Sequence, residues 1–329
     1  MLLILTHVPH MQKGLVLSAG GLVERLLSGD RRALARVISK IERGDPETAE
    51  IIAGLYPHTG NALTVGFTGP PGVGKSSIIA ELIKLYRAEE KRVGIVSVDP
   101  SSPFSKGAIL GDRIRLSDHF LDPGVFIRSM GSRGHLGGLA GGSRLAALAM
   151  EASGMDVVIF ETVGVGQGEV EVASAADTVV LALQPGAGDA VQALKAGVME
   201  VADVFCINKA DHPRAKGAAS EVRSILEIGH ELDPDPWFPP IIMTRGDTGE
   251  GVEELKANIE KHRSYLRESG KLEKRRRNSL REFVVSWATA RLEKEMQERL
   301  KQKDTDLMER VYRREIDPIS ASEKIFKEV

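Results

Sequence analysis

The chain has 329 residues, of which 42% are hydrophobic and 27% are charged, and its formal net charge is −2. These values are ordinary for a globular protein, and the small net charge predicts no general attraction to nucleic acid or to an anionic membrane. The one cysteine, Cys206, excludes an intramolecular disulfide, and no apolar run reaches the ~18 residues of a membrane span, so we expect a cytoplasmic protein.

Helical patterns dominate the first sixty residues. Leu22 and Leu26 belong to a series of apolar residues near helical spacing, and Asp30 is placed to cap a helix after a Ser-Gly break. The apolar run at the N-terminus has no basic residue before it, so we expect no signal peptide. We predict a helical extension over residues 1–60, packed on the main domain.

From residue 61 the pattern changes to strands that alternate with helices. Several strand-like runs are continuously apolar, as a parallel sheet covered on both faces requires. We therefore predict an α/β fold with a doubly wound, mostly parallel sheet over residues 61–270, which binds ligands at the carboxyl ends of its strands. The predicted strands are 63–69, 92–99, 125–130, 156–162, 177–184, 204–208 and 240–244. The predicted helices are 75–89, 140–153, 189–202, 214–231 and 251–267.

Residues 271–329 return to helical patterns and are predicted to form an arm. A first helix carries an apolar stripe, and a further helix is expected around Leu307, Val311 and Tyr312. The stripe is predicted to pack either on its own domain or on a second copy of the chain. The basic run at 274–277 is typical of a solvated helix start, and the balanced net charge disfavours nucleic acid there. The stripe comprises Leu280, Phe283, Val284, Trp287, Leu292, Met296 and Leu300.

The first predicted strand runs into a glycine-rich loop with the pattern Gly-x4-Gly-Lys-Ser. This pattern between a strand and a helix is typical of a P-loop. Glycines allow backbone amides to approach phosphate oxygens, Lys75 adds positive charge at the β- and γ-phosphates, and the Ser76 hydroxyl suits Mg²⁺. We therefore predict a nucleotide site. The predicted contacts are Gly69, Gly72, Val73, Gly74, Lys75, Ser76 and Ser77.

A second motif, Asn208-Lys209-Ala210-Asp211, follows a later strand and indicates which base is bound. The Asp211 carboxylate can accept hydrogen bonds from guanine N1–H and its exocyclic amine, whereas adenine offers an acceptor there, and such a mismatch discriminates strongly. The Lys209 stem can lie along the base, and Asn208 can tie this loop to the phosphate loop. The motif favours GTP over ATP. A third base-side loop would follow the next strand, with candidates Thr244, Arg245 and Gly246.

The predicted strand 156–162 ends with a carboxylate that is followed by several glycines. Glu161 is expected beside the phosphate-loop strand, where it would hold Mg²⁺ directly or through water. Gly164 is expected to approach the γ-phosphate with its backbone amide and to come free when that phosphate leaves. Gln167 is predicted either to position the attacking water or to face solvent.

Two further acids and a glycine-rich loop supply more candidates. Asp99 is predicted to bind a metal-ligated water or to orient the nucleophile, or else to cap the next turn. Asp112 has the same candidate roles, or pairs with a neighbouring arginine. The glycine-rich loop around Arg128, Arg133 and His135 is predicted at the edge of the site, where an arginine would either stabilise transition-state charge or belong to the surface.

Six segments in chain order resemble the G-protein chaperones of adenosylcobalamin-dependent acyl-CoA mutases: GPPGVGKSS, VDPSSPFSKGAILGDRIRL, VFIRSMGSRGHLGGLA, DVVIFETVGVGQGEVEV, ALQPGAGDAVQALKAGVMEVADV and NKAD. This group of P-loop GTPases, of the SIMIBI type, includes the methylmalonyl-CoA mutase-associated GTPases and proteins labelled arginine/ornithine transport kinases. The resemblance covers about residue 20 to at least residue 270. It is marked by Glu161 in place of the usual aspartate.

The resemblance implies a homodimer built partly with the C-terminal arm, and slow Mg²⁺-dependent conversion of GTP to GDP that the mutase accelerates. The nucleotide state would gate delivery of adenosylcobalamin to the mutase and removal of damaged cofactor. The chain departs from the family at Ala190, where relatives carry Glu, and at Gly168, where they carry Ser. Two other functions stay open: a kinase or ATPase linked to amino-acid transport, and a GTP-gated assembly factor for another metalloenzyme.

Overall fold

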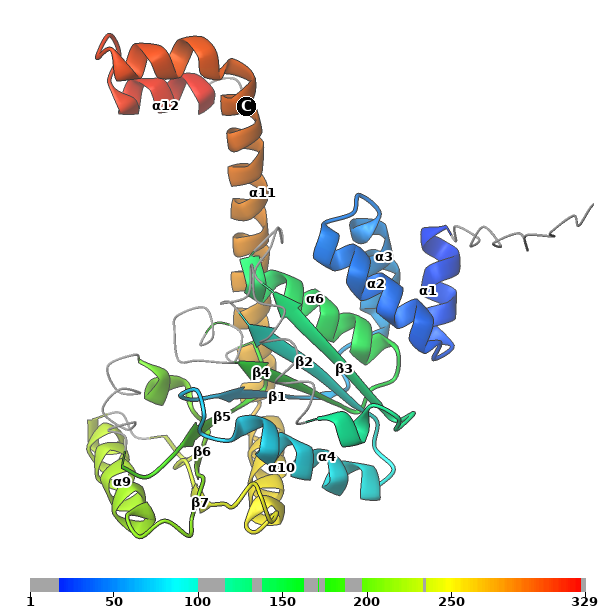
Figure 1. The fold of residues 1–329 in the computed structure, drawn as a ribbon, viewed down its shortest axis with the longest axis vertical. Coiled ribbons are helices and arrows are strands. Elements are labelled where there is room, and N and C mark those ends of the chain that lie inside the picture. The colour runs from blue at the N-terminus through cyan, green and yellow to red at the C-terminus, as the bar shows by residue number, and fades with distance from the viewer. Residues whose placement is uncertain are drawn as a thin grey trace, which may run out of the picture.

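A central sheet with helices on both faces forms the body of the protein (Figure 1). The computed structural model describes residues 18–99, 116–131, 138–162, 171, 175–186, 197–232 and 235–326. The strands are β1 (Leu63–Thr68), β2 (Val93–Asp99), β3 (Val125–Gly131), β4 (Val157–Thr162), β5 (Thr178–Leu183), β6 (Val204–Ile207) and β7 (Ile241–Met243). They lie in the order β3-β2-β4-β1-β5-β6-β7, and every pairing is parallel. The predicted α/β fold with a doubly wound parallel sheet is confirmed.

Hydrophobic clusters cover both faces of the sheet. Side chains alternate along a strand, so Val158 and Phe160 of β4 face one core while Val157 and Ile159 face the other. Burial on both faces explains why the strands read as continuous apolar runs. The helices are α1 (Ala19–Leu27), α2 (Arg31–Arg43), α3 (Thr48–Leu55), α4 (Lys75–Ala88), α6 (Gly138–Ala152), α9 (Ala215–Leu232), α10 (Val252–Glu268), α11 (Lys271–Tyr312) and α12 (Pro318–Phe326).

The N-terminal helices α1, α2 and α3 pack together against α6. Leu22 and Leu26 are buried in this layer. Asp30 is the N-cap of α2, where its carboxylate accepts hydrogen bonds from the backbone N–H groups of Arg32 and Ala33. The predicted cap at Asp30 is confirmed, and the helical layer covers one edge of the sheet (Figure 1).

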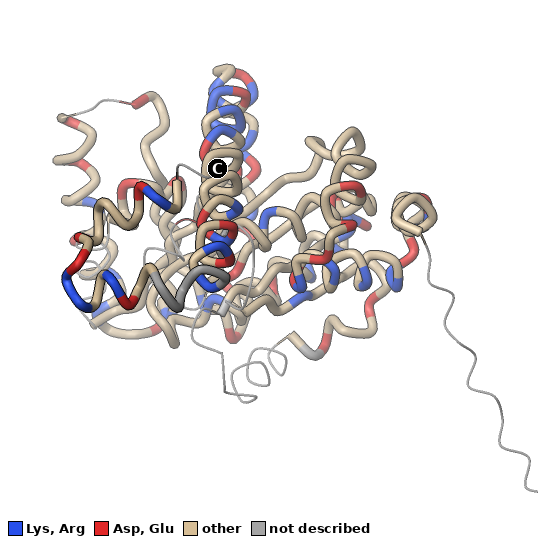
Figure 2. The backbone as a smooth tube through the Cα atoms, turned by 90° about the horizontal axis from the view of Figure 1, so that it is seen from above, with Lys and Arg blue, Asp and Glu red and all other residues tan. Residues whose placement is uncertain are grey.

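The arm differs from its prediction in two respects. Helix α11 runs without a break for 42 residues, so the two helices expected after residue 270 are one, and the short helix α12 follows as an unpredicted element. Phe283 and Trp287 pack against the core beneath α6, whereas Val284 is 64% exposed. Basic and acidic residues are interspersed along α11 (Figure 2).

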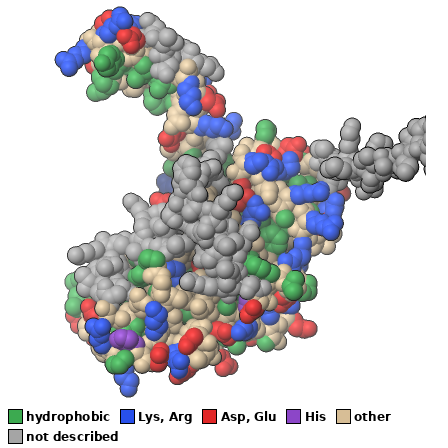
Figure 3. Space-filling model, in the orientation of Figure 1, with side chains coloured by type: hydrophobic (Ala, Val, Ile, Leu, Met, Phe, Trp, Pro, Cys, Tyr) green, Lys and Arg blue, Asp and Glu red, His purple; other side chains and the backbone are tan. Residues whose placement is uncertain are grey.

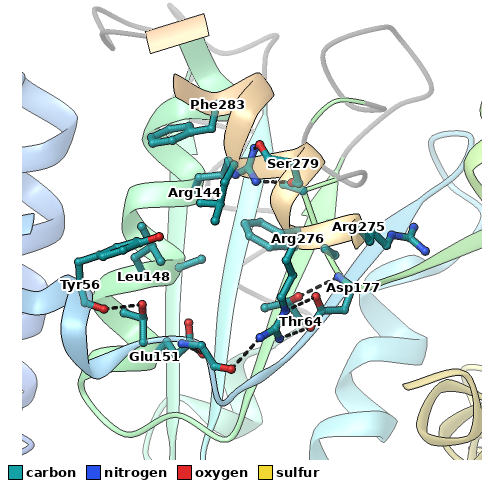
Figure 4. Close-up of a pocket in the computed structure, with 17 residues that line it drawn as sticks. Tyr56, Thr64, Arg144, Leu148, Glu151, Asp177, Arg275, Arg276, Ser279 and Phe283 are labelled. Carbon is teal, nitrogen blue, oxygen red and sulfur yellow. Dashed lines mark hydrogen bonds and ion pairs between the residues drawn. The ribbon is translucent and has the colours of Figure 1, made fainter. Parts of the chain in front are cut away.

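The root of the arm is held to the body around a mostly apolar cavity of about 150 Å³ (Figure 4). Arg144 of α6 donates to the backbone oxygen of Ser279 at 2.8 Å and to its hydroxyl. Arg276 pairs with the buried Asp177 and donates to the carbonyl oxygen of Gly60 at 2.7 Å. The hydrogen bond with Asp177 raises the pKa of Arg276. These contacts set the direction in which α11 leaves the body.

One predicted helix is partly wrong. Residues 187–196 lie outside the described residues, and Val198–Val201 form a 3-10 helix, so the helix predicted for 189–202 does not end as an α-helix. Within the ranges that the structure describes, no helix combines the length and the apolar character that a membrane crossing requires.

Candidate nucleotide-binding site

β1 leads into the predicted phosphate loop, and α4 begins at Lys75 with Gly74 as its N-cap residue. Gly69 and Gly74 have φ angles of 143° and 99°, which L side chains rarely adopt. A Cβ at Gly69 would overlap the carbonyl oxygen of Ala182, and a Cβ at Gly74 would overlap Asn208 Nδ2. Glycine is therefore required at both positions. The loop ends at a helix N-terminus, a favourable place for phosphate.

The ammonium group of Lys75 lies against the backbone of this loop. Its Nζ donates to the carbonyl oxygens of Gly69 at 2.6 Å and Pro70 at 2.9 Å, and the residue is only 6% exposed. A cation held in a glycine-rich loop provides the positive charge that a polyphosphate needs.

Glu161 of β4 links the start of α4 to the sheet. β4 pairs with β1, and Glu161 is in register with Phe67, so the predicted neighbourhood of the two strands is confirmed. The Ser76 hydroxyl donates to Glu161 Oε1, and the Ser97 hydroxyl donates to Oε2 at 3.1 Å. All three polar residues are buried. Hydroxyl and carboxylate oxygens are ligands that Mg²⁺ prefers, so this donor set fits the ion.

Ser97 is a site residue that the sequence reasoning missed. In β2, Ser97 stands between two valines, and apart from the terminal Asp99 it is the one polar side chain of the strand. A hydroxyl inside an apolar strand is a usable signal, because a buried polar group normally has a hydrogen-bond partner. Here that partner is the Glu161 carboxylate, so Ser97 orients the acid from the neighbouring strand.

Several predicted residues lie outside what the structure describes. The backbone of Asp99 ends β2 and is in register with Gly131 of β3, which places it at the carboxyl edge of the sheet, but its side chain lies outside the described part of the chain. The other predicted residues outside the described ranges are Asp112, Arg133, His135, Gly164, Gly168, Gln167 and Ala190.

Arg128 of β3 is described, and its contacts favour the structural alternative. Its Nε donates to Glu42 of α2 at 3.1 Å, and its Nη2 donates to Ser39 at 3.1 Å and also to Glu42. The guanidinium therefore ties β3 to α2 by a charge-assisted pair. The prediction that Arg128 stabilises transition-state charge is not supported by these contacts.

Asn208 joins the loops on the base side. Its Nδ2 donates to the carbonyl oxygen of Val73 at 2.7 Å, which ties the loop after β6 to the phosphate loop as predicted. Its Oδ1 accepts from the Thr244 hydroxyl at 3.2 Å and from the Gly246 backbone N–H at 3.0 Å. Asn208 is 4% exposed, and the three loops therefore share one buried amide.

Val73 and Thr244 are both fully buried between these loops. The carbonyl oxygen of Val73 and the hydroxyl of Thr244 bind the Asn208 amide, and their predicted contacts with the nucleotide stay predictions. The Thr244 hydroxyl also contacts Cys206 Sγ at 3.1 Å. Burial raises the pKa of the Cys206 thiol to about 12, and its predicted role as a small buried strand residue is confirmed.

Lys209, Asp211 and Arg245 lie at the exposed side of these loops. Lys209 adopts a left-handed φ of 58°, and its Nζ contacts Gln184 Oε1 at 2.5 Å and the carbonyl oxygen of Gly72 at 3.4 Å. The Asp211 side chain is 61% exposed and lies 3.6 Å from Arg245 Nε. A carboxylate with this exposure is available to accept hydrogen bonds from a base.

Comparisons with known proteins agree with this geometry. Residues 33–303 match the family model described as "Methylmalonyl Co-A mutase-associated GTPase MeaB". A candidate GTPase of Pyrococcus horikoshii is 46% identical over 309 residues, which cover 94% of this chain and 97% of that protein. The GTPase ArgK of Escherichia coli is 36% identical over 281 residues, 83% of each chain.

A solved structure supports the same assignment. The crystal structure of a LAO/AO transport system kinase aligns with a TM-score of 0.68 at 26% identity, and the alignment covers 94% of this chain and 96% of that one. The phosphate loop, the buried acid on the adjacent strand and the Asn-Lys-x-Asp loop lie within the matched residues. On this evidence the chain belongs to the MeaB family, the methylmalonyl-CoA mutase-associated GTPases, and is a GTP-binding protein.

Proposed function

We propose that the protein is a Mg²⁺-dependent hydrolase that converts GTP to GDP and phosphate, and that it acts as a chaperone of an adenosylcobalamin-dependent acyl-CoA mutase. The contact between Ser76 and Glu161 carries the hydrolase proposal, because it joins the phosphate loop to a buried acid. The client proposal is supported by the family description, which names methylmalonyl-CoA mutase.

The phosphate loop would hold the triphosphate through backbone amides and through the Lys75 ammonium, with Ser77 in the first turn of α4. Asp211 would accept hydrogen bonds from guanine, and the Lys209 stem would lie along the base. Asn208 would keep the base loop and the phosphate loop at a constant separation, since it already bonds to both sides.

Ser76 and Glu161 would hold Mg²⁺, with Asp99 and Asp112 binding the ion or its waters. When bound, the ion would neutralise charge on the β- and γ-phosphate oxygens. Gly164 would sense the γ-phosphate through its backbone amide, and Gln167 would position the attacking water. Ser97 would keep the Glu161 carboxylate oriented toward Ser76, because it binds the other carboxylate oxygen.

Hydrolysis assays with a purified methylmalonyl-CoA mutase test the client proposal. We expect GTP turnover to rise at least about tenfold when the mutase is added, since partner-supplied groups accelerate related GTPases by larger factors. ATP turnover is expected to stay at background with and without the mutase. GTP turnover that no adenosylcobalamin-dependent acyl-CoA mutase changes would contradict the chaperone role and leave the hydrolase assignment standing.

A kinase is the second candidate, and the likeness to the LAO/AO transport system kinase favours it. The Asn208–Asp211 loop argues against ATP as the donor, because adenine would place an acceptor against the Asp211 carboxylate. Phosphate transferred to a protein acceptor in place of free phosphate, measured in the same assays, would support the kinase.

The protein would act as a homodimer built with its arm. Large apolar side chains are exposed along the arm, among them Val284 (64%), Ile319 (74%) and Phe326 (56%). Hydrophobic side chains gather on the hairpin of α11 and α12 (Figure 3). Exposed apolar clusters of this kind mark interaction surfaces, and a second copy would cover them.

Light scattering tests the dimer. We expect a mass twice the 35.6 kDa of the chain, and we expect the double change Ile319→Glu and Phe326→Glu to give the single-chain mass, because two carboxylates would be buried unpaired in the interface. Leu232→Glu is the control, since Leu232 is 83% exposed on α9. A single-chain mass for the unchanged protein would exclude the dimer.

A further inference from the structure

Arg245 is the first residue of a short loop after β7, residues 245–250, whose two ends are joined by backbone hydrogen bonds. Its backbone N–H donates to the carbonyl oxygen of Glu250 at 2.9 Å, and its own carbonyl oxygen accepts from the Gly249 N–H at 2.8 Å. The next residue, Gly246, donates its N–H to Asn208. The backbone that carries the Arg245 side chain is therefore held on two sides, and the guanidinium projects from a rigid base.

Three carboxylates surround the Arg245 guanidinium. Its Nη2 lies 3.2 Å from Asp247, its Nη1 lies 3.9 Å from Glu250, and its Nε lies 3.6 Å from Asp211 Oδ1. The hydrogen bond with Asp247 raises the pKa of Arg245. Two acids thus engage the outer nitrogens of the fork, and the inner nitrogen is directed at Asp211.

The Nε–H group of Arg245 is buried and has no hydrogen-bond acceptor in range among the described residues. A separation of 3.6 Å is an ion pair but is too long for a hydrogen bond. A buried donor without an acceptor is unfavourable. The distance from Arg245 Nε to Asp211 Oδ1 exceeds that of a hydrogen bond by a few tenths of an ångström. A small movement of the Asp211 carboxylate would complete this hydrogen bond.

We propose that Arg245 is a positioning residue that holds the Asp211 carboxylate for guanine and so strengthens selection of the 2-amino group. This inference rests on the proposed role of Asp211 in guanine binding. A carboxylate that accepts from both guanine donors has to present its two oxygens in the plane of the base. Arg245 would restrict that orientation, because its Nε–H lies 3.6 Å from Asp211 Oδ1 and would donate to it after a small movement, while its outer nitrogens stay paired with Asp247 and Glu250.

Affinities for GDP and inosine diphosphate test this role in the full chain. Inosine diphosphate lacks the 2-amino group, so it can donate to Asp211 only once. We expect Arg245→Met, which keeps the aliphatic stem, to weaken GDP about tenfold and inosine diphosphate less than about threefold, which lowers the GDP preference. Arg245→Lys keeps a charge near Asp211 and is expected to retain an intermediate preference. Glu253→Gln is the control, since Glu253 is exposed in the first turn of α10 and is not one of the carboxylates around Arg245.

The outcomes separate the inference from the proposed function. Equal weakening of both nucleotides by Arg245→Met would overturn the inference, because a structural role or a direct contact with the shared 6-oxo group gives that result. In an Asp211→Ala background, Arg245→Met is expected to leave the preference unchanged, since the two residues act as one unit; an additive loss would also overturn it. Failure of the unchanged protein to prefer GDP over ADP would instead refute the assignment of the base loop.

Discussion

Replacing Lys75 by alanine is expected to lower GTP hydrolysis at least about 100-fold, which corresponds to ~2.7 kcal/mol of lost transition-state stabilisation. The Lys75 ammonium lies within the loop against two carbonyl oxygens. Its positive charge would stabilise the negative charge that develops on the transferred phosphoryl group. Lys209 also reaches this loop, at 3.4 Å from the carbonyl oxygen of Gly72. The measurement is single-turnover release of phosphate at saturating GTP.

Lys84→Ala is the matched control for Lys75→Ala. Lys84 lies on the same helix, its side chain is 54% exposed, and it pairs with Glu81 at the surface, so its loss should leave turnover unchanged. Thermal melting of both variants separates a loss of chemistry from a loss of folding. Turnover by a folded Lys75→Ala protein within about threefold of the unchanged protein would refute the role of this loop in hydrolysis.

Exchange of Asp211 for asparagine is expected to reverse the base preference. An asparagine amide can donate to the 2-oxo group of xanthine, whereas the amine of guanine would then meet an N–H group. Sites that depend on such polar pairing reject the mismatched ligand by large factors. We expect GDP affinity to fall at least about 100-fold and xanthosine diphosphate to become the preferred ligand.

Glu253→Gln is again the control, because Glu253 is exposed on α10 and is not part of the base motif. Titration calorimetry with GDP, xanthosine diphosphate and ADP gives all three affinities. If Asp211→Asn kept its preference for GDP, the base would be recognised elsewhere, and the assignment of Asn208–Asp211 as the base loop would be refuted.

The phosphate loop shows which features local sequence can predict. Gly69 and Gly74 have backbone angles that other residues rarely adopt, and such steric limits act within a few residues. The start of α4 and the cap at Asp30 depend on equally short-range hydrogen bonds. The strands were predictable for a related reason, because burial on both faces requires apolar residues at consecutive positions.

Contacts between distant segments could be anticipated only where a motif implied them. The pairing of β4 with β1 brings Glu161 to Ser76 across 85 positions, and the P-loop pattern suggested an acid there. No motif indicated the partner of Ser97. Its hydroxyl marks a buried polar group in an apolar strand, but it reaches Glu161 only because β2 lies beside β4. Likewise, the hydrogen bond from Thr244 to Asn208 depends on the packing of three loops and could not be anticipated from local sequence.

The amino-acid order by itself determined the P-loop pattern, the Asn208–Asp211 motif and the parallel α/β class, because each follows from backbone sterics, hydrogen-bonding patterns or burial of adjacent residues. Only the tertiary structure decided that Arg128 pairs with Glu42 of α2, that α11 is continuous, and that Arg245 faces Asp211. The physical reason is that a charged or polar side chain finds its partner through space, and strand order and loop packing bring together residues that no local spacing relates.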